Sequence, residues 1–307
     1  MRVLVVGAGV IGAVYAARFA EAGHDVSLLA RGARRSAFEA DGVTVRAGGR
    51  TLHTHPRIVG AEDAGGAFDL TVVAVRTTQL DAILDLLRAN DSPTVAFLQH
   101  LGPHADRVRR VLGSNRTVFA FPGVGGLVSA DGSVEYVDVA AQPTTIDATA
   151  ERAIVLRSAI ASTGMRTAME PDMPGWLATH EVFVACLGAG ILNSGGDAPT
   201  LAANHARLLG VVQSVREGFV SLSSSGTTVT PKALRVLFSR MPRWFAAAYW
   251  RRALRGPVGT VAIAPHVRAS RDDEFADLCS DVLARVGDPD RTPTLTPLLT
   301  PWAGDMS

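Results

Sequence analysis

The sequence opens with Met1-Arg-Val-Leu-Val-Val-Gly-Ala-Gly-Val-Ile-Gly12, in which an apolar run leads directly into three glycines. The spacing predicts that Gly7 makes a tight turn after a strand and that Gly9 lets backbone N–H groups approach a ligand. Gly12 lets the following helix pack closely on the strand. The N-terminus of that helix then faces an anion, so the stretch predicts a site for the pyrophosphate of a dinucleotide.

The residues after the glycines decide the interpretation, because glycine triplets also arise by chance in a chain with 30 glycines. A helical pattern covers 10–22 and ends at Gly23, and an apolar run at 24–30 predicts a second strand. Strand, glycine turn, helix and strand are typical of a Rossmann-type domain. The expected cofactor contacts in this loop are Gly7, Gly9, Val10, Ile11 and Gly12.

The end of the second predicted strand indicates which dinucleotide is bound. NAD enzymes usually place Asp or Glu there to hold the ribose 2′-hydroxyl, but this chain has Arg31, followed by Arg34 and Arg35. A guanidinium suits a 2′-phosphate through charge-assisted hydrogen bonds, which predicts NADP(H) with Arg31 as a contact. The alternative is a solvated basic loop, more so for Arg34 and Arg35 than for Arg31.

Composition limits the class of protein. The chain has 307 residues, 47% hydrophobic and 19% charged, enough for two packed domains. A net charge of +1 gives no reason to expect nucleic acid or an acidic membrane as a partner. Cys186 and Cys279 stand alone, which argues against a disulfide framework or a metal site and fits a reducing cytoplasm. Apolar stretches such as 182–192 are shorter than the roughly 20 residues that span a bilayer, so we expect no membrane segment. The sequence begins with a predicted strand and lacks a basic segment followed by a long apolar run, so we expect no signal peptide.

Strands and helices alternate after the first unit, which predicts an α/β fold with a parallel sheet. The expected strands are 69–75, 94–98 and 117–121, with helices at 79–87 and 105–112 between them. Turn-flanked β-residues at 42–53 suggest a hairpin insertion. The segment 121–139, rich in glycine and valine, is expected to complete the sheet.

From about Thr149 the pattern changes to long helical stretches, expected at 149–162, 176–192, 199–224, 231–254 and 272–286. Pro171, Pro174 and Gly175 interrupt the pattern, so the domain boundary falls near them. We divide the chain into an NADP-binding domain, 1–168, and an all-helical domain for substrate binding or dimerisation, 169–307. The proline-rich end, 288–307, is expected to be an ordered-to-frayed tail.

Four further segments carry a resemblance to a known family. Val72-Val-Ala-Val-Arg-Thr-Thr-Gln79 is similar to a strand and loop beneath the cofactor, and Phe97-Leu-Gln-His-Leu-Gly102 to a loop beside the nicotinamide. Trp176 opens a helix where the family has a Trp-x-Lys segment, and 265–274 is similar to a stretch that contributes a substrate-binding Glu. In these features the chain resembles the ketopantoate reductases, which reduce 2-dehydropantoate with NADPH. The resemblance implies cofactor contacts at Arg76, Gln99 and His100 and a substrate contact at Glu274.

The chain departs from the family where chemistry is expected. Lys232 is its only lysine, and the family's catalytic lysine, two residues after the Trp, falls on Ala178. The family's two helix asparagines fall on Val182 and Cys186. The loop lysine and loop asparagine become Arg76 and His100. The resemblance therefore implies a divergent reductase that lacks the usual lysine and acts on a substrate other than ketopantoate.

A carbonyl reductase needs a group that protonates or stabilises the developing alkoxide. Helix geometry returns Glu181 nearly to the face of Ala178, whereas His180 lies about 200° around the helix from Ala178, on the face of Trp176. His100 lies on a loop at the carboxyl end of a strand, where open α/β sheets bind ligands. The candidate catalytic residues are Glu181, His180 and His100.

Each of these assignments has a simpler alternative. Glu181 could be an exposed charge, and His180 could pack on the tryptophan. Glu274 follows Arg271-Asp-Asp, which is also an ordinary helix start. Arginines and aromatic residues gather at 240–255, where a solvated helix face competes with an anion-binding patch.

Together these features predict an NADPH-dependent oxidoreductase that transfers hydride to a small carbonyl or imine substrate. The chief alternative is a non-catalytic NADP(H)-binding or redox-sensing protein. A third hypothesis is that the chain is related to the β-hydroxyacid dehydrogenases. That group also relies on a helix lysine, so Ala178 weakens this hypothesis as well. We expect a small-molecule substrate, no nucleic-acid or membrane partner and a cytoplasmic location, and the helical domain could support a homodimer.

Overall fold

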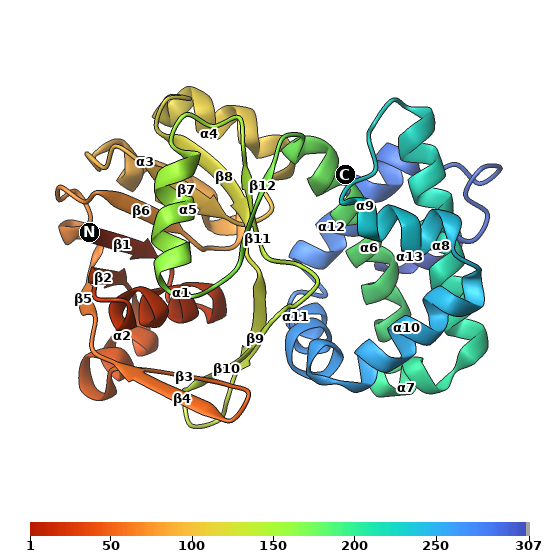
Figure 1. Cartoon of the computed structure of the whole chain (residues 1–307), viewed down its shortest axis with the longest axis horizontal. Helices are drawn as coiled ribbons and strands as arrows, with labels where there is room; N and C mark the ends of the chain where they lie inside the picture. The colour runs from red at the N-terminus through yellow and green to blue at the C-terminus, as the bar shows by residue number, and fades with distance from the viewer. Residues whose placement is uncertain (305–307) are drawn as a thin grey trace. The chain divides into compact units, whose positions relative to one another are not determined.

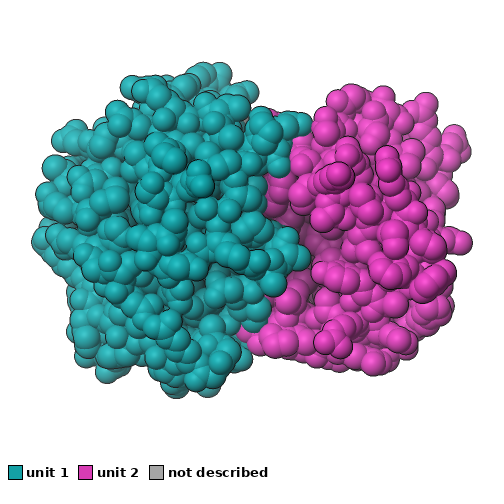
Figure 2. All heavy atoms as spheres, viewed as in Figure 1, with its two compact units in different colours: residues 1–173 teal, residues 174–307 magenta. Residues whose placement is uncertain are grey.

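The computed structural model describes residues 1–304, apart from the side chain of Pro103, and divides into two compact units (Figure 2). The first unit is Met1–Met173 and the second begins at Pro174. The sequence places the boundary earlier, between 168 and 169. Strand β12 (Thr167–Glu170) explains the difference, because it pairs with β11 (Thr144–Asp147) and so keeps its residues in the sheet.

The first unit is built on an eight-stranded sheet with the order β12-β11-β8-β7-β6-β1-β2-β5 (Figure 1). All its pairs are parallel except β11 with β8, which confirms the expected α/β fold. The remaining strands are β1 (Arg2–Val6), β2 (Asp25–Leu29), β5 (Arg57–Val59), β6 (Leu70–Val73), β7 (Val95–Leu98) and β8 (Thr117–Phe121). The chain adds β2 on one side of β1 and β6 on the other, so the strand order reverses at β1, and open sheets of this kind bind ligands at such a point.

Strand β1 joins two hydrophobic cores. Val3 and Val5 contact the core beneath α1 (Val10–Glu21) and α5 (Ala153–Ser162). Leu4 and Val6 contact the core beneath α3 (Leu80–Arg88) and α4 (Ala105–Leu112). All four strand residues are fully buried, which is why the first strand reads as one continuous apolar run.

A second sheet of four strands has the order β4-β3-β10-β9. Strands β3 (Val43–Ala47) and β4 (Arg50–Thr54) form the expected hairpin, whose turn is Gly48-Gly49 with positive φ at both residues. The prediction that 121–139 completes the main sheet is wrong. Strands β9 (Val124–Val128) and β10 (Val134–Asp138) pair with each other, and β10 also pairs with β3, so they extend the hairpin instead. The place beside β8 in the main sheet is taken by β11.

The second unit is helical (Figure 1), as the sequence predicts. Its helices are α6 (Met173–Leu192), α7 (Ala198–Ala203), α8 (His205–Ser224), α9 (Lys232–Arg235), α10 (Arg243–Arg255), α11 (Ala264–Ala269), α12 (Glu274–Val286) and α13 (Leu295–Leu299). By length and composition α6 could cross a membrane, but 83% of its apolar window is buried within the structure, as expected of a core helix. The only lysine, Lys232, is exposed on α9.

The helix expected at 149–162 is observed as α5, inside the first unit, in keeping with the predicted 1–168 division. Three other sequence expectations for the helices need correction. The helix expected at 199–224 breaks at Asn204, whose side chain accepts a hydrogen bond from the N–H of Arg207 and so begins a new helix. The helix expected at 231–254 breaks before Pro242. The tail contributes α13, and its Leu295 and Leu299 are fully buried in the helical core.

Candidate functional site

The three glycines after β1 have different surroundings. Gly7 has φ +110°, and a Cβ there would lie 2.4 Å from the carbonyl oxygen of Ala74. A Cβ on Gly12 would lie 1.8 Å from the carbonyl oxygen of Gly7. A Cβ on Gly9 would meet no protein atom within 4 Å. The fold itself therefore requires Gly7 and Gly12, whereas Gly9 borders open space that a ligand can enter.

Helix α1 begins at this open space without a side-chain cap. Gly9 is its N-cap residue and its first turn carries no acidic side chain. The carbonyl of Gly9 accepts the first intrahelical hydrogen bond, from the N–H of Ala13, at 3.0 Å. The N–H groups of Val10, Ile11 and Gly12 precede that bond and point out of the helix end. This is the arrangement that binds phosphate groups in other proteins.

The loops after β6 and β7 are tied together beside the glycine loop. The N–H of Val75 donates to Oε1 of Gln99 at 3.3 Å, and the hydroxyl of Thr77 donates to the carbonyl of His100 at 3.0 Å. Since β6 is the neighbour of β1, the structure brings the predicted Arg76, Gln99 and His100 to the same edge of the sheet as the glycines. The Nε2 of Gln99 is buried and has no hydrogen-bond acceptor among the described residues.

Arg31 and Arg35 have opposite surroundings. Arg31 is the exposed N-cap residue of α2 (Gly32–Asp41), and no acidic side chain within residues 1–304 lies within ion-pair distance of it. Arg35 forms ion pairs with Glu39 at 2.8 Å and with Glu62 at 3.5 Å. Arg31 therefore keeps its guanidinium for a ligand, while that of Arg35 is already neutralised.

Arg34 supports the glycine loop, a role that the sequence did not indicate. Its Nε donates to the carbonyl of Ala8 at 3.2 Å, and its Nη1 donates to the carbonyl of Gly132 at 2.7 Å. The guanidinium lies 4.2 Å over the ring of Phe38. Partial burial lowers the pKa of Arg34 from its ordinary value. Arg34 thus connects the glycine loop, α2 and the β9–β10 turn, and is not a solvated charge.

In the helical unit, His180 and Trp176 lie on one face of α6, as the helix geometry predicts. Their rings are stacked, with centroids 4.9 Å apart and planes 12° from parallel. Phe183 adds a tilted contact to His180 at 6.3 Å. These contacts fix the orientation of the His180 ring.

Glu181 is not an exposed charge. Only 2% of it is exposed, and its Oε2 lies 3.2 Å from Nη1 of Arg285 on α12. The exposed-charge alternative is therefore wrong, and this carboxylate is held by a cation from a distant segment. Glu274 is the first residue of α12, where the carboxylate of Asp273 accepts its N–H, so the structure places Glu274 at a capped helix start.

The positions that the resemblance aligns with polar family residues lie in the helical core. Ala178 is 2% exposed, and Val182 and Cys186 are fully buried. Burial raises the pKa of the Cys186 thiol well above its usual range, and the nearby Cys279 and Glu217 act in the same direction. At these three positions α6 offers apolar or neutral side chains only.

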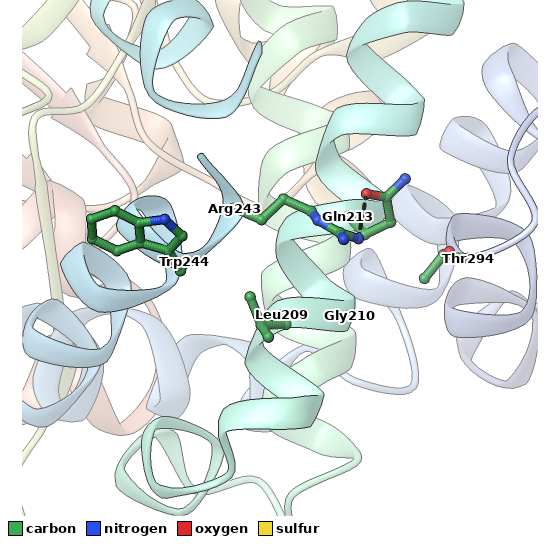
Figure 3. A pocket seen from close by; sticks show the side chains of 6 residues that line it. All are labelled: Leu209, Gly210, Gln213, Arg243, Trp244 and Thr294. Atoms are coloured by element: carbon green, nitrogen blue, oxygen red, sulfur yellow. Dashed lines mark hydrogen bonds between the residues drawn. The ribbon is translucent and has the colours of Figure 1, made fainter. Parts of the chain in front are cut away.

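The arginine-rich α10 borders a separate hollow of about 430 Å³ (Figure 3). There Nη1 of Arg243 donates to Oε1 of Gln213 at 3.2 Å, and Gln213 donates in turn to Glu217 at 3.0 Å. Burial raises the pKa of Glu217, but hydrogen bonds from Gln213, Leu295 and Thr294 outweigh it and lower the pKa. Because this network anchors the start of α13, we assign it to stability.

The site residues fall into two groups, one in each unit. The N-terminal unit carries Gly7, Gly9, Val10, Ile11, Gly12, Arg31, Arg76, Gln99 and His100. The helical unit carries His180, Glu181 and Glu274. Among the described residues no three His, Cys, Asp or Glu side chains form a metal-binding group.

Comparison with known proteins shows similarity to one family and to several solved structures. Residues 3–150 match the family model described as ketopantoate reductase PanE/ApbA. Comparison with curated proteins finds no match. The solved 2-dehydropantoate 2-reductase from Geobacter metallireducens GS-15 is 16% identical, with a TM-score of 0.77 over 98% of this chain and 99% of that one.

Two other solved structures show the same fold. The 2-dehydropantoate 2-reductase from Methylococcus capsulatus is 18% identical, with a TM-score of 0.71 over 98% of this chain and 94% of that one. D-mandelate dehydrogenase with NADH and anilino(oxo)acetate is 13% identical, with a TM-score of 0.72 over 98% of this chain and 97% of that one. The chain thus has an α/β unit with a parallel sheet followed by a helical region, as in ketopantoate reductase structures.

Proposed function

We propose that this chain is an NADPH-dependent oxidoreductase of the ketopantoate reductase type, which transfers hydride to a small carbonyl or imine substrate other than ketopantoate. The observation that carries the proposal is the start of α1 at Gly9, which has no side-chain cap and borders open space. This start lies within residues 3–150, the part of the chain that matches the ketopantoate reductase family model. The family match supports a dinucleotide as the ligand. The guanidinium of Arg31, which no described acidic side chain neutralises, supports NADP(H) over NAD(H).

A dinucleotide held by the glycine loop at Gly9 would supply the hydride for the carbonyl carbon, and the protein would supply the proton for the carbonyl oxygen. His100 is the candidate donor in the N-terminal unit, because its loop is tied to the loop after β6 at the carboxyl edge of the sheet. Glu181 and His180 are the candidates in the helical unit. The pairing of Glu181 with Arg285 favours a role for this carboxylate in charge balance.

Ketopantoate carries a carboxylate and a hydroxyl, and the family's polar partners for such groups are replaced here by the buried Ala178, Val182 and Cys186. This supports a substrate less polar than ketopantoate. The ligand anilino(oxo)acetate, bound to a dehydrogenase of the same fold, suggests aryl-substituted oxo acids as members of a test panel. Steady-state assays with ketopantoate, apolar ketones, aryl oxo acids and imines would test the proposal. Reduction of one or more non-ketopantoate members with NADPH is the expected result.

The same three positions also favour a second candidate, a non-catalytic NADP(H)-binding or redox-sensing protein, because α6 offers no lysine at Ala178. Two measurements distinguish these functions: reduction of the substrate panel, and the effect of site variants on NADPH binding. If NADPH binds tightly but no member of the panel is reduced, and His100, His180 and Glu181 variants leave binding unchanged, the binding protein becomes the better account.

The Arg31→Ala variant is expected to lose the preference for NADPH over NADH. Charge-assisted hydrogen bonds contribute roughly 1.5–3 kcal/mol each, which corresponds to about a tenfold to hundredfold preference in the unmodified protein. Fluorescence titration of both cofactors measures it. Arg35→Ala is the matched control, since that guanidinium is already paired with Glu39 and Glu62. Equal affinities in the unmodified chain, or a preference that survives Arg31→Ala, would refute the phosphate assignment.

The Arg34→Ala variant is expected to weaken both cofactors equally, by about tenfold, because it removes two hydrogen bonds that hold the glycine loop and the β9–β10 turn. Arg34→Lys is not expected to rescue binding, since an ammonium cannot span both carbonyls as the planar guanidinium does. The readout is the ratio of the two dissociation constants. A change in that ratio would show that Arg34 contacts the 2′-phosphate directly.

A further inference from the structure

Two histidines converge at the edge of the second sheet, outside every residue group assigned above. His53 is on β4 and His55 follows it, and residues two apart on a strand point to the same side. Both are exposed. Their Nε2 atoms are 3.0 Å apart, and their rings lie 4.7 Å apart at 87°. Two imidazole nitrogens therefore already lie next to each other on the surface.

The ring of His53 is oriented by its neighbour across the hairpin. Thr44 on β3 lies opposite His53, and its hydroxyl is 2.8 Å from Nδ1 of that ring. When Nδ1–H donates to this hydroxyl, the lone pair of His53 is on Nε2. Such a hydrogen bond on the far nitrogen is the usual support of a metal-binding histidine.

The ring of His55 is oriented by packing on Gly42. Gly42 has φ +68°, and a Cβ there would lie 2.8 Å from Nδ1 of His55. The ring occupies the space that any side chain at position 42 would need. Both imidazoles are thus held in place before a ligand arrives, which lowers the conformational entropy that binding would cost.

We propose that His53 and His55 form a two-histidine site for a divalent transition metal, with Cu²⁺ bound most tightly, then Ni²⁺ and Zn²⁺. Imidazole nitrogens bind such metals at about 2.0–2.1 Å, so two of them at adjacent coordination positions lie roughly 3 Å apart. The present separation is 3.0 Å. On binding, the Nε2–H···Nε2 hydrogen bond is replaced by two metal–nitrogen bonds, and His55 carries its proton on Nδ1.

The surroundings make this an open site. Among the described residues no third His, Cys, Asp or Glu joins the pair, so water or an external ligand completes the coordination sphere. Two arginines of the hairpin are already neutralised. Arg46 pairs with Asp131 at 2.8 Å, and Arg50 pairs with Glu21. Because each guanidinium is paired with a carboxylate, it repels a bound metal cation less than an unpaired guanidinium would.

The test is a titration of the untagged full chain with Cu²⁺ and with Zn²⁺, in which calorimetry measures the binding. Electron paramagnetic resonance of the Cu²⁺ complex then identifies the nitrogen ligands. We expect one site with nitrogen splitting from two imidazoles. His53→Asn or His55→Asn should weaken binding by tenfold or more, and Thr44→Val by about tenfold. His24→Asn and His205→Asn are matched controls and should have no effect.

Each outcome has a defined meaning. Circular dichroism and the affinity for NADPH should be unchanged in the His53 and His55 variants, because both side chains are exposed. If the double variant His53→Asn, His55→Asn binds both metals as tightly as the unmodified chain, the proposal is overturned. A nitrogen splitting from a single imidazole would overturn it as well.

Discussion

Gly9→Val is expected to lower the affinity for NADPH by a hundredfold or more while leaving the fold intact. No protein atom lies within 4 Å of a Cβ at this position, and the backbone at φ −76° is open to any residue. Valine is a poorer N-cap residue than glycine, at a cost of about 1 kcal/mol or less. The loss of binding is large because the added carbons occupy the approach of the pyrophosphate to several N–H groups.

Circular dichroism, urea denaturation and cofactor titration of Gly9→Val separate the two effects. Gly12→Ala is the contrasting variant, since its Cβ would lie 1.8 Å from a backbone oxygen. That variant should lose stability, by about 1–3 kcal/mol or more. If Gly9→Val keeps its affinity for NADPH, the glycine loop has only a structural role and the proposed function fails with it.

Ketopantoate is expected to be reduced several powers of ten more slowly than ordinary enzymes turn over their substrates, which is on the order of 1–10³ per second. Each polar substrate group left unpaired in a closed site costs roughly 1–3 kcal/mol, and three partners are replaced by Ala178, Val182 and Cys186. Initial rates with NADPH measure this. Turnover of ketopantoate at an ordinary rate would refute the proposed substrate class.

Ala178→Lys should not restore that activity. Position 178 is 2% exposed in the helical core, where a lysine would be both too large and unpaired. We expect the free energy of unfolding to fall by about 2 kcal/mol or more, as measured by urea denaturation. A stable Ala178→Lys variant with ketopantoate reductase activity would show that this position faces substrate and not the core.

The local features of the fold could be predicted from the sequence. The strand, glycine turn and helix of 1–22 depend on neighbouring residues, and so does the β3–β4 hairpin with its Gly48-Gly49 turn. The partners of 124–138 could not be predicted, because an apolar strand pattern does not state which strand it pairs with. The same holds for α13, whose buried Leu295 was hidden in a proline-rich tail.

In the candidate site, too, local features could be predicted from the sequence and contacts between distant segments could not. The open space at Gly9 follows from a local motif, but the contact of Arg34 with Gly132 joins segments far apart in the chain. The ion pair of Glu181 with Arg285 likewise had no signal near either residue. Helix geometry did place His180 beside Trp176, because both belong to one helix.

The single lysine has a consequence for labelling. Lys232 is exposed on α9 and is the only lysine in the sequence. An amine-reactive fluorophore or cross-linker therefore has a single lysine side chain to react with. Lys232 is not among the proposed cofactor or catalytic residues, so a reporter attached to it can follow titrations without entering the proposed site. Acetylation or ubiquitination of a lysine side chain would likewise have one target.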